Sequence, residues 1–268
     1  RSNVKPDQIT YSALINACGK GGELQRALEF YAEMEEKGFS VNANTYTCLL
    51  TACGDAGEWE KAISLHSEMV QKGHRGDAYT YSAVISACGK SGEWQKAIGL
   101  FDEMQRQRIA PNAVTYCAVI SACEKGDNWQ KALRYFDEMV EEGIRPDSIA
   151  YCAAIKACDR GHHWKKALTL FDEMIEKKLT RDYITYNATI SALARAGKWE
   201  LALGVLNEMI AYGVNPNTFS FNVVISSCAE DGNWKRAQSL IEAMVGMRRV
   251  PNLDTYNPIL AACCKAGE

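Results

Sequence analysis

The chain has 268 residues, a formal net charge of −3 and eleven cysteines. This nearly neutral balance excludes a polycationic molecule, so a surface for nucleic acid would have to be a local stripe of cations. The sequence has no apolar run of about 18 residues, the length that a transmembrane helix needs, and no membrane contact is expected.

The sequence repeats itself every 35 residues without an insertion or a deletion. A period of this length is typical of solenoids and other repeat arrays. Each copy is counted from the residue after its final Asn or Asp, and we call the copies repeats one to seven. They occupy residues 8–42, 43–77, 78–112, 113–147, 148–182, 183–217 and 218–252. We expect residues 1–7 to be the tail of a preceding repeat, and 253–268 to be the first helix of an eighth, incomplete repeat.

The pattern of apolar residues in each repeat predicts two helices. In repeat four, Val114, Ala118 and Ala122 recur at helical spacing, and a second helical run begins at Trp129. The polar segment 124–128 separates the runs, and a glycine and a proline follow the second one. Each repeat is therefore predicted to be an antiparallel helical hairpin, which is too small to bury its own apolar face. Repeats must stack to share a core.

Three columns of the repeat are predicted to fill this core with small or flexible apolar side chains. They are Cys18, Cys53, Cys88, Cys123, Cys158, Cys228 and Cys263; Ala27, Ala62, Ala97, Ala132, Ala167, Ala202 and Ala237; and Met34, Met69, Met104, Met139, Met174, Met209 and Met244. Packed helices lie about 8–10 Å apart, which is too far for a disulfide between neighbouring cysteines of the column. No CxxC pair occurs, so no metal site is expected.

All six tryptophans stand at the start of the second helix of a repeat, and they allow two interpretations. They would either pack neighbouring helices or form a row of stacking platforms for bases. The small alanine three residues later favours packing. Acidic residues also recur, as "DEM" on the second helix. Their regular recurrence marks a solvated or structural face rather than a single acid–base pair, so we expect no catalytic residues and no enzymatic activity.

The segments "VTYCAVISAC", "WQKALRYFDEM" and "GIRPD" resemble the pentatricopeptide repeat in its pure 35-residue (P-type) form, over essentially the whole chain. Tetratricopeptide repeats have a 34-residue period and a different signature. The resemblance implies an all-α fold, a right-handed α-solenoid (superhelix) of stacked helix-turn-helix repeats. It also implies binding of single-stranded RNA at about one base per repeat along the first helices, without a cofactor, in mitochondria or chloroplasts.

In this family the fifth and the last residue of each repeat select the base, and we call them the base-selecting pair. Carried onto this chain, the pairs are Ser12 with Asn42, Thr47 with Asp77, Ser82 with Asn112, Cys117 with Asp147, Cys152 with Asp182, Asn187 with Asn217 and Asn222 with Asn252, followed by Asn257 in the partial repeat. The implied preference is A for Ser or Thr with Asn, G for Thr with Asp, and a pyrimidine for Asn with Asn. Cys with Asp lies outside the common code, with G favoured. The last residue would alternatively cap the next helix, and both roles can coexist.

The resemblance also implies contacts beside the base-selecting pair. The second residues would sandwich the bases; they are Ile9, Tyr79, Val114, Ile149, Ile184 and Phe219, with Asn44 departing from the apolar pattern. The cations at the thirteenth position would meet phosphates; they are Lys20, Lys90, Lys125, Arg160, Arg195 and Lys265, with Asp55 and Glu230 interrupting the column. A cation at the C-terminus of a helix is also favourable by itself. The alternative function is a protein-binding scaffold within a larger organellar assembly such as a ribosome.

Overall fold

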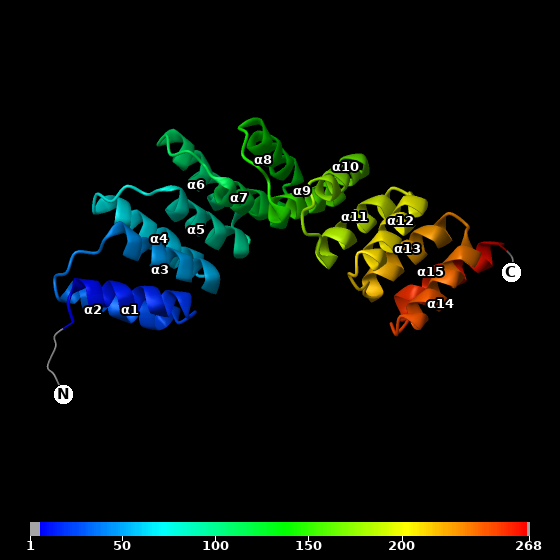
Figure 1. The fold of residues 1–268 in the computed structure, drawn as a ribbon, viewed down its shortest axis with the longest axis horizontal. Helices are drawn as coiled ribbons and strands as arrows, with labels where there is room; N and C mark the ends of the chain where they lie inside the picture. The colour runs from blue at the N-terminus through cyan, green and yellow to red at the C-terminus, as the bar shows by residue number, and fades with distance from the viewer. Residues whose placement is uncertain (1–5, 267–268) are drawn as a thin grey trace. The chain divides into compact units, whose positions relative to one another are not determined.

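The computed structural model describes residues 6–266, and the side chains of residues 6–264. Its described part is all α-helical, as the repeat pattern predicts. The first helices of the repeats are α1 Gln8–Lys20, α3 Ala43–Ala56, α5 Ala78–Lys90, α7 Ala113–Lys125, α9 Ser148–Arg160, α11 Tyr183–Arg195, α13 Thr218–Glu230 and α15 Leu253–Ala266. The second helices are α2 Leu24–Glu36, α4 Trp59–Gln71, α6 Trp94–Arg106, α8 Trp129–Glu141, α10 Trp164–Glu176, α12 Trp199–Ala211 and α14 Trp234–Gly246 (Figure 1).

The chain divides into two compact units, one ending at Arg145 and the other beginning at Pro146. Within the first unit α1, α3, α5 and α7 contact one another in order, and within the second unit α9, α11, α13 and α15 do the same. Inside each unit, a second helix contacts the first helix of its own repeat and that of the following repeat. The described second helices of a unit make no such contact with one another. The first helices therefore form the continuous layer of each unit.

Small residues near the ends of the first helices allow this layer to close. A Cβ added to Gly54 would lie 3.2 Å from the carbonyl oxygen of Ala83 on the next first helix. A Cβ added to Gly89 would lie 2.7 Å from Cβ of Ala122, which is closer than carbon atoms pack. Both glycines occupy the twelfth position of a repeat. A side chain there would push neighbouring first helices apart, because a packed interior has no space to absorb it.

Two tight turns per repeat reverse the chain, and each contains one residue in the left-handed region. The first is the fifteenth residue of the repeat and the second is the thirty-first. Glycine takes most of these places because it has no Cβ to clash there. Five other residues adopt the same conformation, namely Arg108, Asp127, His162, Lys178 and Arg248, with φ between 54° and 59°. The geometry of the hairpin thus holds even where glycine is absent.

The predicted core columns are buried, except that Cys18 and Cys263 at the two ends of the cysteine column are half-buried. The alanine and methionine columns are 0% exposed in all seven repeats. Burial raises the pKa of the Cys53 and Cys88 thiols to about 11 and that of Cys123 to about 12, so these thiols stay protonated at neutral pH. The tryptophans are only half-buried. The Trp94 ring packs on Gly126 of the next repeat, and the Lys96 ammonium lies 3.5 Å from the Trp59 ring centroid.

A buried tyrosine ties the two helices together in repeats one to six. Its hydroxyl donates to the glutamate of the acidic motif 22 residues later, for example Tyr116 to Glu138 at 3.0 Å and Tyr151 to Glu173 at 2.7 Å. The same bond forms in the other repeats up to the sixth. In repeat seven the tyrosine is replaced by Phe221, and Ala243 stands in the place of the glutamate. The recurrent acidic residue is therefore structural.

We predict that Gly126→Ala destabilises the first unit, because the added Cβ would meet ring atoms of Trp94 at 2.1 and 2.3 Å. Overpacking of this kind costs about 1–3 kcal/mol. Gly99→Ala is the matched control: Gly99 lies inside α6 with no atom within 4 Å of the added Cβ, so alanine should stabilise the helix by about 0.5–1 kcal/mol. Urea unfolding measures both changes. Equal stability of the two variants would contradict the close packing of Trp94 on Gly126.

Candidate nucleic-acid interface

The last residue of each repeat is the N-cap of the next first helix. The side-chain oxygen Oδ1 of Asn42 accepts the backbone N–H of Thr45 at 2.8 Å, and Oδ1 of Asp77 accepts that of Thr80 at 2.8 Å. Asn112, Asp147, Asp182, Asn217 and Asn252 cap the following helices in the same way. The capping role expected from the sequence is therefore confirmed. It explains why this position holds only Asn or Asp, the strongest N-caps along with Ser.

Capping uses one of the two polar atoms at the end of each side chain. Oδ1 of Asp77 accepts both the N–H and the hydroxyl of Thr80, at 2.8 and 2.7 Å. Burial by itself would raise the pKa of Asp77, but these hydrogen bonds outweigh it and lower the pKa, so the carboxylate is ionised at neutral pH. Among the described residues, Oδ2 of Asp77 and Nδ2 of Asn112 have no hydrogen-bond partner. Asp77 thus presents an acceptor and Asn112 a donor, whereas Nδ2 of Asn252 donates to Asp254 at 3.2 Å.

A hydroxyl at the third position of the next repeat joins the two members of a base-selecting pair. In repeat one, Oγ1 of Thr45 lies 3.1 Å from Oγ of Ser12 and 2.9 Å from Oδ1 of Asn42. Thr80, Thr115, Ser220 and Thr255 make the corresponding contacts to the pairs of repeats two, three, six and seven. The structure therefore brings the two predicted members together in these repeats. The sequence reasoning missed the third residue, although its recurrent Thr or Ser was a visible signal.

Access to the fifth residue differs between repeats. Ser12, Thr47, Cys152, Asn187 and Asn222 are half-buried, and Asn257 of the partial repeat is exposed. Ser82 is only 5% exposed and donates to the carbonyl oxygen of Ala78 at 2.6 Å. In repeat three, the more accessible member of the pair is therefore Asn112, which is half-buried. Cys117 is also buried, and it lies in the first unit whereas its partner Asp147 lies in the second.

The second residues form a column of exposed apolar side chains. Ile9 is 78% exposed, Tyr79 66%, Val114 55% and Phe219 50%. Ile149, Ile184 and the polar exception Asn44 are exposed as well. Large apolar side chains that recur on one exposed face usually mark a contact surface. Each stands in the first turn of a first helix, two residues after the N-cap that belongs to the preceding pair.

The cations of the thirteenth position are exposed at the C-terminal ends of the first helices, and at least two of them meet carboxylates. Nζ of Lys90 lies 2.9 Å from Oδ1 of Asp55, in the preceding repeat. Nε of Arg195 lies 3.7 Å from Oδ1 of Asp159, whose pKa is raised by burial and only partly lowered again by this guanidinium. Lys20, Lys125 and Arg160 are exposed too, and the side chain of Lys265 lies outside the described residues.

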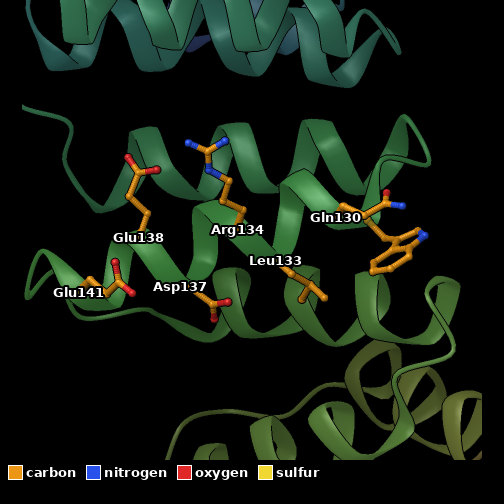
Figure 2. Close-up of a pocket in the computed structure, with 7 residues that line it drawn as sticks. Gln130, Leu133, Arg134, Asp137, Glu138 and Glu141 are labelled. Carbon is orange, nitrogen blue, oxygen red and sulfur yellow. The ribbon is translucent and has the colours of Figure 1, made fainter.

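Two surface hollows differ in charge, one on first helices and one on a second helix. One lies between α11 and α13 and is lined by Arg195, Phe219 and Glu230 among others, so it joins the second-position and thirteenth-position columns. The other lies on the second helix α8, where Arg134 and Glu138 project to the same side (Figure 2). Asp137 and Glu141 also line it, which makes it acidic. Carboxylates outnumber cations on the second helices, whereas cations outnumber carboxylates on α1 to α13 of the first helices.

Metal and membrane sites find no support in the part of the chain that the structure describes. No three side chains among its His, Cys, Asp and Glu residues are grouped to hold a metal ion. None of its helices combines the length and apolar character needed to cross a membrane.

Models of known protein families match most of the chain. The model described as the pentacotripeptide-repeat region of PRORP matches residues 1–160. The PPR repeat model matches residues 149–179, and the PPR repeat family model matches residues 181–230 and 216–265. A comparison with curated protein sequences gives no match.

Solved structures give the same result. The pentatricopeptide repeat protein PPR10 from maize is 29% identical, with a TM-score of 0.63 over 96% of this chain and 37% of that chain. PPR10 in complex with an 18-nt psaJ RNA element is 24% identical, with a TM-score of 0.59 over 99% and 44%. The PPR domain of Arabidopsis thaliana protein-only RNase P 1 in complex with tRNA is 17% identical, with a TM-score of 0.58 over 65% and 92%. This chain thus spans less than half the length of PPR10.

We predict that the cap at Asp77 tolerates Asn but not Ala. Asp77→Ala removes the acceptor for both donors of Thr80 and should lower the free energy of unfolding by about 0.5–2 kcal/mol. Asp77→Asn keeps that acceptor and should leave stability nearly unchanged at neutral pH. Because the pKa of Asp77 is lowered by folding, its stabilising effect is present above the unfolded pKa and is lost as the pH falls through the folded pKa. Thermal unfolding of the three proteins at neutral pH measures the cap. Equal loss in both variants would contradict it.

Proposed function

Since the chain belongs to the pentatricopeptide repeat family, we propose that it binds single-stranded RNA at about one base per repeat and acts on organellar transcripts. The main support is one arrangement that recurs along the first helices. An exposed apolar side chain stands beside a helix-capping Asn or Asp, and the second polar atom of Asp77 and of Asn112 is available. The solved complex of PPR10 with an 18-nt RNA adds support, since PPR10 aligns with nearly all of this chain.

Each part of this arrangement suits one part of a nucleotide. The apolar second residues offer flat, water-excluding contacts to base faces, which every base provides. The side-chain polar atom of the Asn or Asp that the cap does not use faces the base edge. It acts as a donor in Asn and as an acceptor in Asp, and this difference distinguishes bases. The exposed cations at the thirteenth position suit phosphates. Repulsion by the acidic second helices would keep the RNA on the first helices. Mitochondria or chloroplasts are the proposed location, on family grounds.

We assign the described repeats a binding role and no catalysis. The carboxylates that recur on the second helices accept hydrogen bonds from buried tyrosines, as Glu138 does from Tyr116. They are therefore held in the structure rather than aimed at a substrate. Any activity of a longer protein would come from elsewhere.

A protein-binding scaffold is the second candidate, and one observation favours it. The second helices carry a column of exposed aliphatic side chains at the twenty-eighth position: Val70, Val140, Ile175, Ile210 and Val245. The base-selecting pairs, in contrast, belong to the first helices and their N-caps. The two functions are separable, because only RNA binding depends on phosphate charge.

We predict a change of base preference in Asp77→Asn. The ionised carboxylate only accepts, so with Thr47 it should select guanine, which offers donors at N1 and N2. The amide can donate to N1 of adenine, so the preference should move from G toward A at that one position. Discrimination of this kind is worth about 1–3 kcal/mol. Binding is measured on two RNAs that differ at this base.

Asn112→Asp in repeat three is the reciprocal variant and should move the preference from A toward G. Both exchanges retain a strong N-cap, so neither should alter folding. If wild type and Asp77→Asn bind the two RNAs with the same ratio, base selection by these columns is falsified, and Asp77 is only a helix cap.

We predict that binding weakens with salt. Each phosphate contact lowers the slope of log affinity against log salt by about 0.7, so the five thirteenth-position cations of repeats one to seven would give about −3.5. Lys125→Ala should flatten the slope by about one contact and weaken all sequences alike. It is preferred to Lys90→Ala, which would also unpair Asp55. Lys61→Ala, on the second helix α4, is the control that should leave the slope unchanged. A salt-independent response would favour the scaffold.

A further inference from the structure

The third residue of each first helix is a small hydroxyl residue in all repeats but one. It is Thr45, Thr80, Thr115, Thr185, Ser220 and Thr255, with Thr10 at the start and Ala150 as the exception. From Thr45 to Thr255 these hydroxyl residues are at most 2% exposed. A buried hydroxyl is costly unless it is hydrogen-bonded. For the five hydroxyls whose contacts are given above, the partners are the two members of the base-selecting pair of the preceding repeat. The hydroxyl thus connects groups proposed to meet RNA.

Repeat six shows most clearly what this hydroxyl does. Oγ of Ser220 lies 2.6 Å from Oδ1 of Asn187 and 2.9 Å from Oδ1 of Asn217. A hydroxyl has a single hydrogen, so it donates to one of them at a time. Oδ1 of Asn217 already accepts the backbone N–H of Ser220 at 2.9 Å. Oδ1 of Asn187 has no other donor among the described residues, and its distance is the shorter one. The hydroxyl therefore donates to Asn187.

This donation sets the orientation of the Asn187 amide. An asparagine side chain can present either its oxygen or its nitrogen after a rotation of 180°, and only its hydrogen bonds decide between them. With Oδ1 held by Ser220, the Nδ2 group of Asn187 is left to face a ligand. The backbone N–H of Ser220 likewise donates to Oδ1 of Asn217, so that the Nδ2 group of Asn217 also faces the ligand. Both members of the pair then present donors, which suits the acceptor-rich edge of a pyrimidine.

We propose that the third-position hydroxyl is a positioning residue that sets base preference for the pair of the preceding repeat. This proposal rests on the proposed RNA binding and adds a third residue to each base-selecting pair. The hydroxyl does not touch the base; it acts by holding the fifth residue in one orientation. In repeat six that residue is Asn187, held by Ser220.

The exception at Ala150 separates this role from capping. Asp147 caps α9 without a hydroxyl, because its Oδ1 accepts the backbone N–H groups of Ile149 and Ala150 at 3.0 and 2.9 Å. A first helix therefore starts normally when the third residue is alanine. The hydroxyl is not needed for the cap, which leaves the orientation of the fifth residue as its distinct effect.

In repeat seven the fifth residue has a second hydrogen bond besides the one to the third-position hydroxyl. Oγ1 of Thr255 lies 2.7 Å from Oδ1 of Asn222, as Ser220 does from Asn187. Here Nδ2 of Asn222 also donates to Oδ1 of Asn252 at 3.0 Å, which is a second restraint on the same amide. Removal of the hydroxyl should consequently matter less in repeat seven than in repeat six.

The test compares Ser220→Ala with wild type on four RNAs that differ only at the base aligned with repeat six. Wild type should prefer pyrimidines over purines by about tenfold or more, which corresponds to about 1.4 kcal/mol. Ser220→Ala should reduce this ratio to within about threefold, with little change in preference at the other positions. Ser220→Thr restores the hydroxyl and should restore the ratio. Ser239→Ala removes an exposed hydroxyl from α14 and should change nothing.

Thr255→Val makes the same measurement in repeat seven, in case Ser220→Ala does not fold, and a smaller loss of preference is expected there. Thermal unfolding accompanies each variant. If wild type discriminates but the hydroxyl variants keep its ratios, or weaken all four RNAs equally, the positioning role is overturned while RNA binding stands. If wild type itself shows no preference at any repeat, base selection fails first, and the positioning role fails with it.

Discussion

Each first helix begins where the side-chain oxygen of an Asn or Asp accepts a backbone N–H three residues later. This hydrogen bond fixes the start of the helix and thereby the register of every column counted from it. It also fixes the orientation of the capping side chain, because one of its two polar atoms is used. The same bond therefore connects local folding to the proposed contact with a base. A residue with a single polar atom, such as serine, would cap as well but would leave nothing for the ligand.

The close layer of first helices is the second constraint. Consecutive first helices touch within each unit, and in the first unit glycine allows the close approach, as Gly89 does toward Ala122. This contact brings the third residue of one repeat within hydrogen-bond reach of the fifth residue of the repeat before it, as between Thr115 and Ser82 at 2.8 Å. A side chain in place of Gly89 would meet Ala122 and disturb that contact. Packing between repeats thus sets the distance between the third-position hydroxyl and the fifth residue of the proposed base-selecting pair.

The repeat pattern predicts the helices, their pairing and the buried columns because these depend on periodicity, which a sequence displays directly. It also predicts the capping role of Asp77. Three features depend on side chains that meet across helices and were not predicted. The tryptophans are half-buried, since Trp94 lies on a glycine at the edge of the layer rather than within it. The acidic residue Glu138 is bound by Tyr116, and the hydroxyl of Thr80 joins Thr47 to Asp77.

The division of charge between the two helices of a repeat completes this picture. A carboxylate on the second helix is needed to pair with the buried tyrosine, and a lysine four residues later can pair with it, as Lys177 does with Glu173. Burial would raise the pKa of Glu173, but the hydrogen bonds from Tyr151 and Lys177 outweigh it and lower the pKa, so the group stays charged. Carboxylates are thereby more numerous on the second helices than on the first, which nevertheless carry Asp55 and Glu230. The first helices need no such carboxylate, and the exposed ends of five of them carry the cations that an RNA backbone requires.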